Sequence, residues 1–159
     1  KACFGGVFSL LRCVCVQRIV FLLRERRRAA STARPTARPR VVVMENTNAR
    51  YLTETDIPEK ADFCSIDTSF ISLTNILPPL KMLLKPGGHI ISLIKPQFEA
   101  GKDQVGKGGV VRDPAIHEEV IEKVKRFGTE ELGFEWLDLC NSPITGPAGN
   151  IEFLAYWKV

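Results

Sequence analysis

This sequence lacks an apolar run long enough to cross a membrane. Its most apolar stretch, residues 3–23, is interrupted by Arg12, Gln17 and Arg18. No uninterrupted span therefore reaches the roughly 20 residues that a bilayer requires. A basic tail follows this stretch, where a signal peptide would have small residues at its cleavage site. We therefore expect a protein without a membrane partner.

Cysteine and histidine are too few and too scattered to form a metal site. There are five cysteines, an odd number without paired spacing, and Cys13 and Cys15 are too close together for the common zinc patterns. The two histidines, His89 and His117, have no ligand companions at useful spacing. Unpaired cysteines favour a reducing compartment. We therefore expect no bound metal and a cytoplasmic location.

The excess of basic over acidic residues is confined to the first quarter of the chain. Residues 1–40 carry nine Arg and one Lys against one Glu, whereas residues 41–159 carry 12 basic and 17 acidic side chains. The formal net charge of +4 is therefore no argument for nucleic-acid binding. The Arg-rich run 24–40 has almost no residues that could form a core. We expect residues 1–39 to be foreign to the fold, through a shifted reading frame or a wrongly assigned exon, and residues 40–159 to be the C-terminal portion of a single folded domain.

Two apolar runs end on charged residues and are predicted to be neighbouring strands. Residues 62–67 end on Asp67, and residues 88–95 end on Lys95. Between them, residues 71–85 have apolar side chains at the spacing of one helical face, followed by a Pro-Gly-Gly stop signal. A crossover helix of this length joins parallel strands, which places Asp67 and Lys95 at the same edge of the sheet.

The remaining elements bring a third charged residue to that edge. Residues 114–132 are predicted to form a helix, with Asp113 as its N-cap and a glycine just past its end. Strands 134–139 and 151–157 follow, and the short link between them makes the last strand antiparallel. Its first residues, including Glu152, then return to the carboxyl edge, where open α/β sheets bind their ligands.

Each of the three charged residues also has a simpler interpretation. Asp67 has the position of a turn or helix-capping acid, and Lys95 that of a solvated strand end. Pro96 takes the chain out of the sheet, so we expect Lys95 to be exposed at the edge. Glu152 lies in a strand that we expect to be buried, where an unpaired carboxylate is costly. Lys95 is its expected partner.

A long glycine-rich loop, residues 97–113, carries Lys102, Lys107 and Arg112. At the ligand edge, such a loop can grip the phosphate of a nucleotide or of a polynucleotide backbone. These three side chains are the candidate RNA-binding residues, and a solvated loop is the alternative. The GKGG segment lacks the spacing and the following Lys-Ser/Thr helix of the NTPase phosphate loop.

From about residue 40 to its end, the chain closely resembles the methyltransferase domain of the TlyA (haemolysin A) family. This family belongs to the FtsJ-like ribosomal RNA 2'-O-methyltransferases. An ordered series of segments, rather than any single motif, carries the resemblance. The segments are VVVMENTNARYL (41–52), SIDTSFISLTNILPPL (65–80), LLKPGGHIISLIKPQFEAGKDQVGKGGVVRDPAIHEEV (83–120) and SPITGPAGNIEFL (142–154).

The resemblance implies a class I, Rossmann-like methyltransferase fold, in which the sheet is mostly parallel and the last strand antiparallel. It also implies S-adenosylmethionine as the cofactor and ribosomal RNA, or a ribosomal subunit, as the partner. Asp67, Lys95 and Glu152 match the last three positions of the family's catalytic Lys-Asp-Lys-Glu tetrad. By this resemblance, Lys95 lies near the ribose 2'-hydroxyl and assists loss of its proton. The two carboxylates then orient the ammonium and the nucleotide.

The resemblance also assigns cofactor-binding residues, and it exposes a departure from the family. Asn48, Ala49 and Arg50 match the segment beside the adenosyl group, and Asp67 is the fourth cofactor-binding residue. Family members have a glycine-rich cofactor loop, an acidic residue after the second strand and the first lysine of the tetrad before this region. Residues 1–40 contain none of these features. We therefore expect a sheet without its first strands, in an N-terminally incomplete or inactive copy.

Three other functions stay open at this point. The first is a non-catalytic fragment that binds RNA weakly. The second is a membrane-active haemolysin, as the family's older name suggests, although the sequence offers no spanning segment and no clear amphipathic helix. The third is an unrelated doubly wound nucleotide-binding protein, because the same fold hosts many activities.

Overall fold

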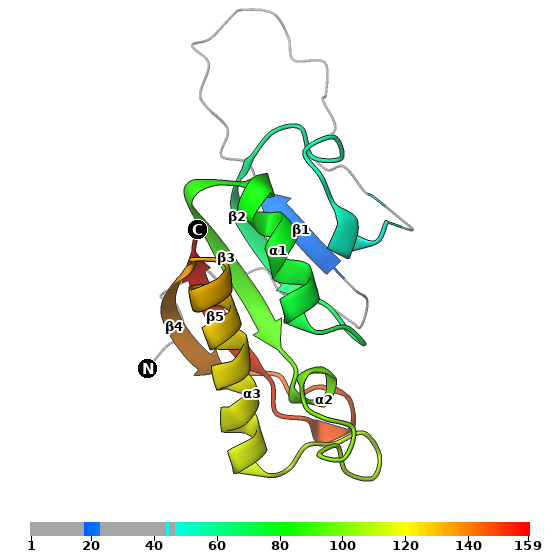
Figure 1. Ribbon diagram of the computed structural model, residues 1–159. Helices are drawn as coiled ribbons and strands as arrows, with labels where there is room; N and C mark the ends of the chain where they lie inside the picture. The colour runs from blue at the N-terminus through cyan, green and yellow to red at the C-terminus, as the bar shows by residue number, and fades with distance from the viewer. Residues whose placement is uncertain (1–17, 23–43, 45–46) are drawn as a thin grey trace, which may run out of the picture.

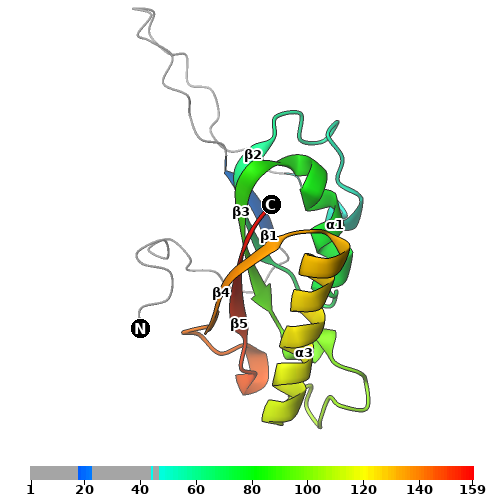
Figure 2. The ribbon, with the colours of Figure 1, turned by 60° about the vertical axis from the view of Figure 1, so that its left-hand side comes forward.

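The computed structural model describes residues 18–22, 44 and 47–159, which form a five-stranded sheet with helices packed on one side (Figures 1 and 2). The strands are ordered β1-β2-β3-β5-β4 across the sheet. They comprise β1 (Arg18–Leu22), β2 (Ala61–Asp67), β3 (Leu84–Ile94), β4 (Glu135–Asn141) and β5 (Phe153–Lys158). The helices are α1 (Leu73–Leu83), α2 (Pro96–Glu99) and α3 (Pro114–Arg126), with short helical turns η2 (Ala49–Tyr51), η3 (Phe127–Glu131) and η4 (Pro147–Gly149).

The directions of the strands confirm a mixed α/β sheet with a reversed last strand. β2 and β3 are parallel, whereas β5 is antiparallel to both β3 and β4. It follows that β2, β3 and β4 run in one direction and β5 runs against them. Ile94 at the end of β3 pairs with Phe153 at the start of β5. The carboxyl end of β3 and the first residues of β5 therefore share one edge, as the connection lengths predicted.

The crossover helix is shorter than predicted, because the strand after it begins early. α1 ends at Leu83 and β3 starts at Leu84, whereas we expected the helix to reach Lys85 and the strand to start at Gly88. Leu84 already has extended dihedrals (φ −104°, ψ 150°). Pro86 disfavours helical dihedrals at the residue before it, so the helix has to end ahead of Lys85.

α3 has the predicted caps. Asp113 Oδ1 accepts a hydrogen bond from Ala115 N at 2.9 Å, and Pro114 occupies the first helical position. The helix continues into the π turn η3, after which Gly133 takes φ 75°, a left-handed conformation that favours glycine. The predicted helix over 114–132 therefore corresponds to α3 and η3 together.

The core lies between the sheet and the two longer helices, which Figure 2 shows on the same side of the sheet. Trp157 of β5 is fully buried at its centre. Its ring meets Trp136 edge-on, at 4.4 Å between centroids, and its Nε1 donates to Ser92 Oγ at 3.0 Å. This packing fixes the strands whose ends carry the charged residues. Other buried core residues are Cys64, Ile66, Leu73, Ile76, Leu77, Leu80, Ile90, Ile94, Val120, Val124 and Phe153.

β1 occupies the edge of the sheet beside β2. The two strands are antiparallel, with Arg18 opposite Asp67 and Leu22 opposite Phe63. This edge would be unprotected if residues 1–39 stood apart from the fold, and the structure pairs it instead. The rest of that segment lies outside the described residues. Its separate coding origin stays a prediction, and an unbroken reading frame across residue 40 in the sequenced gene would contradict it.

Candidate active site

Lys95 and Asp67 form a close ion pair at the carboxyl edge of the sheet. Lys95 Nζ lies 2.6 Å from Asp67 Oδ1 and donates to Ser69 Oγ at 3.1 Å. β2 ends at Asp67 and β3 ends one residue before Lys95, so the parallel pairing of the two strands brings both side chains to one place. The two residues therefore meet as their strand ends predicted.

Lys95 is buried, which corrects the expectation that it would be exposed. Only 11% of its side chain is accessible to solvent. Pro96 ends the strand as expected, but it also occupies the first position of α2, where proline is favoured. The N–H of Phe98 donates to the Lys95 carbonyl at 2.9 Å. The chain thus turns back at the edge instead of leaving it, and the ammonium stays among Asp67 and Ser69.

Glu152 reaches the same edge, but its direct partner is Gln97, so the expectation that it would pair with Lys95 is wrong. Gln97 Nε2 donates to Glu152 Oε1 at 3.0 Å, whereas the ammonium of Lys95 is engaged by Asp67. Burial raises the pKa of the Glu152 carboxyl. The Gln97 hydrogen bond and then the Lys95 charge oppose this rise, and the Asp67 charge adds to it.

The turn before β5 packs closely on the Glu152 carboxylate. Gly146 donates its N–H to the Asn150 carbonyl at 2.8 Å. A Cβ atom at Gly146 would collide with Glu152 Oε1. The absence of a side chain at Gly146 therefore lets the turn hold Glu152 against Gln97.

We predict that Glu152→Gln stabilises the protein more at pH 7 than at pH 4.5, because the folded-state pKa of Glu152 lies above its ordinary value. A carboxyl with a raised folded pKa contributes stability below its unfolded pKa and loses it as pH rises through the folded value. The amide does not titrate and still offers an oxygen to Gln97. Urea unfolding at both pH values measures the difference between variant and wild type. A difference that is equal at the two pH values, or smaller at pH 7, would contradict the assignment.

An aromatic pair lies beside the charged residues. The ring centroids of Phe70 and Phe98 are 4.8 Å apart, and Phe70 is 84% exposed. Phe70 also has φ 62°, which residues other than glycine rarely adopt and which its surroundings must maintain. Sequence reasoning missed Phe70, together with Ser69 and Gln97. Their one signal is that each lies within three residues of Asp67 or Lys95.

The expected cofactor residues lie at η2. Asn48 caps this turn, its Oδ1 accepting from Arg50 N at 3.1 Å, and the Arg50 guanidinium lies over the Tyr51 ring at 5.6 Å. Ala49 is half-buried against the core. Two surface hollows lie along α3, and neither is lined by these residues or by Asp67. The residues expected to contact a cofactor are present among the described residues, at η2 and at the end of β2.

The glycine-rich loop is anchored at its base by a buried amide. Asn150 is 3% exposed, and its side chain accepts from Val111 N at 3.1 Å and donates to the Gly109 carbonyl at 3.0 Å. His117, also buried, hydrogen-bonds the Val111 carbonyl through Nε2 at 3.0 Å. Gly109, like its neighbour Gly108, has a positive φ (75° and 82°), so this tight turn requires glycine. Asn150, which holds the loop in place, precedes Glu152 by only two residues, so the base of the loop lies close in sequence to the candidate site.

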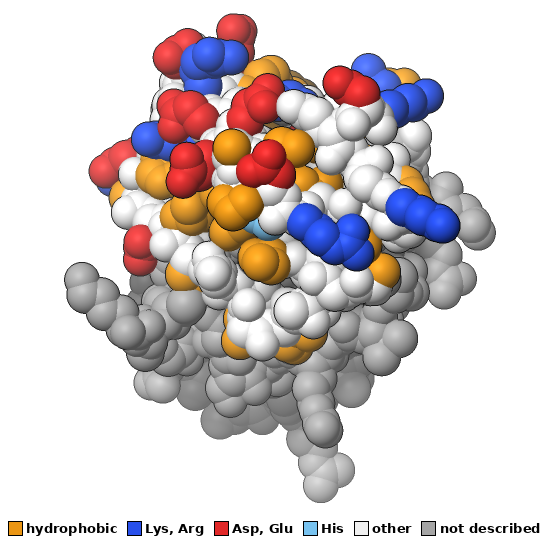
Figure 3. All heavy atoms as spheres, turned by 90° about the horizontal axis from the view of Figure 1, so that it is seen from below, with side chains coloured by type: hydrophobic (Ala, Val, Ile, Leu, Met, Phe, Trp, Pro, Cys, Tyr) orange, Lys and Arg blue, Asp and Glu red, His pale blue; other side chains and the backbone are white. Residues whose placement is uncertain are grey.

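The basic residues of this loop project from a fixed base. Lys102, Lys107 and Arg112 are all exposed. Figure 3, which looks onto the end of the molecule that holds α2 and this loop, shows most acidic side chains on one part, with basic side chains among them, and further basic side chains with few acids on the opposite part. An anionic ligand is favoured where basic side chains outnumber acidic ones.

Two further properties bear on function. Within residues 18–22, 44 and 47–159, no helix combines the length and the apolar character needed to cross a membrane. In the same part of the chain, no group of three or more His, Cys, Asp or Glu side chains is arranged to hold a metal ion.

The fold and the site define a class of protein. Proteins with an open α/β sheet bind their ligands at the edge where the parallel strands end, and in this chain a lysine and two carboxylates gather at that edge. Comparison with known proteins identifies the family within this class. The model of the FtsJ-like methyltransferases matches residues 26–159, and the chain belongs to this family. The matched region begins inside the segment 1–39.

Individual relatives agree with this family. A candidate rRNA methyltransferase of Bacillus subtilis (strain 168), YqxC, is 52% identical over 118 residues, which cover 74% of this chain and 42% of YqxC. The 16S/23S rRNA (cytidine-2'-O)-methyltransferase TlyA of Mycobacterium tuberculosis (strain CDC 1551 / Oshkosh) is 45% identical over 120 residues, covering 76% of this chain and 44% of TlyA. The crystal structure of a candidate hemolysin from Lactococcus lactis matches with a TM-score of 0.72 at 50% identity, covering 77% of this chain and 58% of that one. The chain thus spans less than half the length of the two curated relatives.

Proposed function

We propose that this chain carries the RNA-side half of a methyltransferase site that uses S-adenosylmethionine to modify a ribose 2'-hydroxyl of ribosomal RNA in the cytoplasm. The observation that carries the proposal is the placement of Lys95 Nζ, 2.6 Å from Asp67 Oδ1 and 3.1 Å from Ser69 Oγ, at the ligand edge of an FtsJ-like fold. A lysine held by two fixed partners can direct its remaining N–H toward an incoming oxygen.

Methylation of a hydroxyl needs a positioned oxygen and a route for its proton. When bound, S-adenosylmethionine supplies the methyl group. In this chain, Lys95 would donate its third N–H to the 2'-oxygen and stabilise the negative charge that develops there as the oxygen bonds to the methyl group and its proton leaves to water, while Asp67 and Ser69 fix the direction of Nζ. Glu152, kept in place by Gln97, would orient the nucleotide. Alignment of reacting groups is the main contribution that such a site can make.

A non-catalytic RNA-binding role is the second candidate. It is favoured by one observation: the basic loop is anchored at its base by the buried side chain of Asn150. Beside that loop, the exposed ring of Phe70 suits stacking on an unpaired base.

A chimera separates the two candidates. Residues 47–159 would replace the corresponding segment of the M. tuberculosis TlyA protein, with which this chain shares 45% identity. We expect the folded chimera to transfer a labelled methyl group to ribosomal RNA. A folded chimera that binds S-adenosylmethionine and RNA without transfer would contradict the catalytic proposal. Calorimetry of the 159-residue chain with S-adenosylmethionine then measures whether the chain alone forms a cofactor pocket.

We predict that the basic loop contacts RNA phosphates. Replacing Lys102, Lys107 or Arg112 singly by alanine should reduce the slope of log K against log salt by about 0.7 to 1 per residue. Filter binding of this chain to ribosomal RNA at several salt concentrations measures the slope. Lys81→Ala, which removes an exposed lysine from α1, is the matched control and should leave the slope unchanged. Equal slopes in all four variants would refute the assignment.

A further inference from the structure

Glu99 is a buried carboxylate to which the proposed reaction assigns no role. It is the last residue of α2, four residues after Lys95, and 2% of its side chain is exposed. Burial raises the pKa of the Glu99 carboxyl, and hydrogen bonds from Ser72 and Leu73, followed by the Lys123 charge, oppose the rise. A carboxylate is costly to bury without such partners. The groups that hydrogen-bond or pair with the Glu99 carboxylate therefore indicate its structural role.

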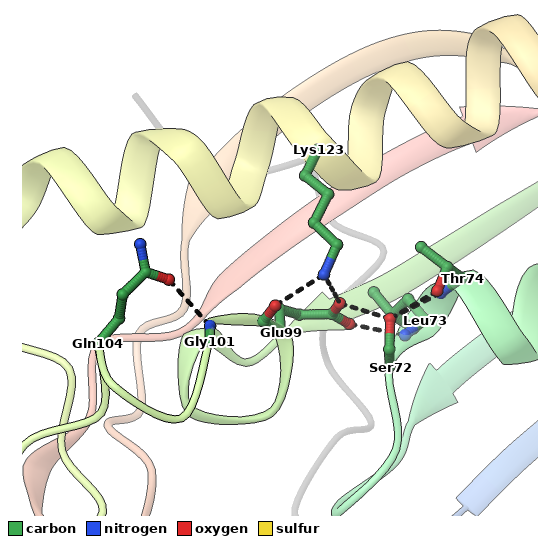
Figure 4. Close-up of polar contacts among 7 residues, drawn as sticks. All are labelled: Ser72, Leu73, Thr74, Glu99, Gly101, Gln104 and Lys123. Atoms are coloured by element: carbon green, nitrogen blue, oxygen red, sulfur yellow. Dashed lines mark hydrogen bonds and ion pairs between the residues drawn. The ribbon is translucent and has the colours of Figure 1, made fainter.

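The Glu99 carboxylate caps a helix that is distant in sequence. Glu99 Oε1 accepts from Leu73 N and Oε2 accepts from Ser72 Oγ, both at 2.6 Å (Figure 4). Ser72 is the N-cap residue of α1, and the first turn of α1 contains no acid. Free N–H groups and the helix dipole both favour a negative charge at this end. Glu99 thus supplies, from α2, the acid that α1 lacks.

A third helix fixes Glu99 from the other side. Lys123 of α3 donates its Nζ to the Glu99 carbonyl at 2.7 Å, and the same atom lies 3.8 Å from Glu99 Oε2 (Figure 4). Both the backbone and the carboxylate of Glu99 are therefore tied to α3. Glu99 is the point where α1, α2 and α3 meet.

Two short turns lie side by side between Glu99 and the candidate catalytic residues. One turn, residues 67–73, leads from β2 to α1, and the other, residues 95–99, leads from β3 through α2. Three residues of the second turn, Lys95, Phe98 and Glu99, contact the first turn in sequence order. Lys95 contacts Asp67 and Ser69, Phe98 contacts Phe70, and Glu99 contacts Ser72 and Leu73. The left-handed conformation of Phe70 lies in the middle of this arrangement, where contacts on both sides maintain it.

We propose that Glu99 is a positioning residue that holds the turn carrying Lys95 against the turn carrying Asp67. Lys95 and Asp67 lie at one end of the paired turns, and Glu99 with Ser72 closes the other end. Without the far closure, the two turns would lose their contact at the end remote from Lys95 and keep the Phe70–Phe98 contact, the Lys95–Asp67 ion pair and the Lys95–Ser69 hydrogen bond. The inference rests on the proposed function only in treating Lys95 as catalytic.

The test observes Lys95 directly in the full chain. In protein labelled with 15N-lysine, the side-chain ammonium of Lys95 should give an NMR signal that exchanges slowly with water, because it is buried and bonded to Asp67 and Ser69. The signal is assigned by its absence from Lys95→Arg. We expect Glu99→Ala to abolish this slow signal. Glu99→Gln should restore it, because the amide oxygen still accepts from Leu73 N and the Ser72 hydroxyl can accept from the amide nitrogen.

A matched control separates positioning from a general loss of stability. Ile76→Val removes one buried methylene group from α1, outside both turns, so it should lower stability and leave the Lys95 signal intact. A slow Lys95 signal that survives Glu99→Ala, or that is lost equally in Ile76→Val, would overturn the proposal. If Glu99→Ala does not fold, Ser72→Ala takes its place. It removes one of the two capping hydrogen bonds, and the Lys95 ammonium signal is measured in it as before. A weakened signal then supports the proposal and an unchanged one overturns it. The signal does not depend on methyl transfer, so an inactive chimera would leave this result standing.

Discussion

Lys95→Ala in the chimera is expected to lower methyl transfer to ribosomal RNA by about 10²- to 10³-fold, the loss typical when one donor to a developing oxyanion is removed. Lys95 Nζ is the one atom that contacts both Asp67 and Ser69 in the described site. Its removal leaves the Asp67 carboxylate without its cation and the 2'-oxygen without a donor. The substitution should lower the turnover rate and leave the affinity for S-adenosylmethionine nearly unchanged, because Lys95 is not among the residues expected to hold the cofactor.

The control for this prediction is an exposed lysine in the same fold. Lys81→Ala in α1 should keep both turnover and cofactor affinity within a few-fold of the parent. Single-turnover rates with labelled cofactor, and calorimetry for cofactor affinity, measure the two quantities separately. Retained turnover in Lys95→Ala would refute Lys95 as the central group of the site. An equal loss of cofactor affinity would place Lys95 at the cofactor instead.

The edge of the sheet was predictable from sequence because its signals are local. Apolar runs that end on Asp67 and Lys95, with a helical period between them, determine two parallel strands and the edge that they share. The short link before the last strand determines its direction and so brings Glu152 to that edge. None of these steps requires knowledge of how side chains pack.

The partners of these residues were not predictable, because side-chain packing decides them. Sequence spacing could not distinguish Asp67 from Glu152 as the partner of Lys95, and the structure selects Asp67. It gives Glu152 an uncharged partner, Gln97, which no charge-pairing argument would propose. Proline at position 96 predicted an exposed lysine, but the same residue begins the turn of α2.

One signal for the Glu99 cap was present in the sequence. An N-cap serine is commonly followed, three positions later, by Glu or Gln that completes the cap. Ser72 is followed there by Asn75, which leaves α1 without an acid in its first turn. A missing local acid leaves this helix start open to an acceptor from elsewhere, and the fold identifies that acceptor as Glu99.

The second large effect is expected in the core, where Trp157→Ala should destabilise the protein by about 3–5 kcal/mol. Trp157 is fully buried, packs edge-on against Trp136 and donates to Ser92 Oγ. Its loss leaves a cavity and an unpaired buried hydroxyl. Domains of this size have a total stability of about 5–15 kcal/mol, so the change removes a large share of it. Urea unfolding followed by circular dichroism measures the loss without relying on tryptophan fluorescence.

The same ring determines whether a second substitution, at Gly128 in η3, stabilises or destabilises the protein. A Cβ atom at Gly128 would overlap Cζ3 and Cη2 of the Trp157 ring, which is rigid and enclosed. Gly128→Ala in the wild type should therefore destabilise by about 1–3 kcal/mol, the usual cost of overpacking a core. In the Trp157→Ala background the overlap is gone. Alanine should then stabilise the helical turn by up to about 1 kcal/mol relative to glycine.

A double-mutant cycle tests this reversal of sign. The two residues are in contact, so their effects should be non-additive, with a coupling of about 1–3 kcal/mol. If Trp157→Ala is too unstable to measure, Trp157→Phe serves as the background, because phenylalanine has no atoms at the positions of Cζ3 and Cη2. Additive effects in both backgrounds would mean that Gly128 does not pack on Trp157. The end of α3 would then be held on the sheet by other contacts, and the glycine at position 128 would have no packing explanation.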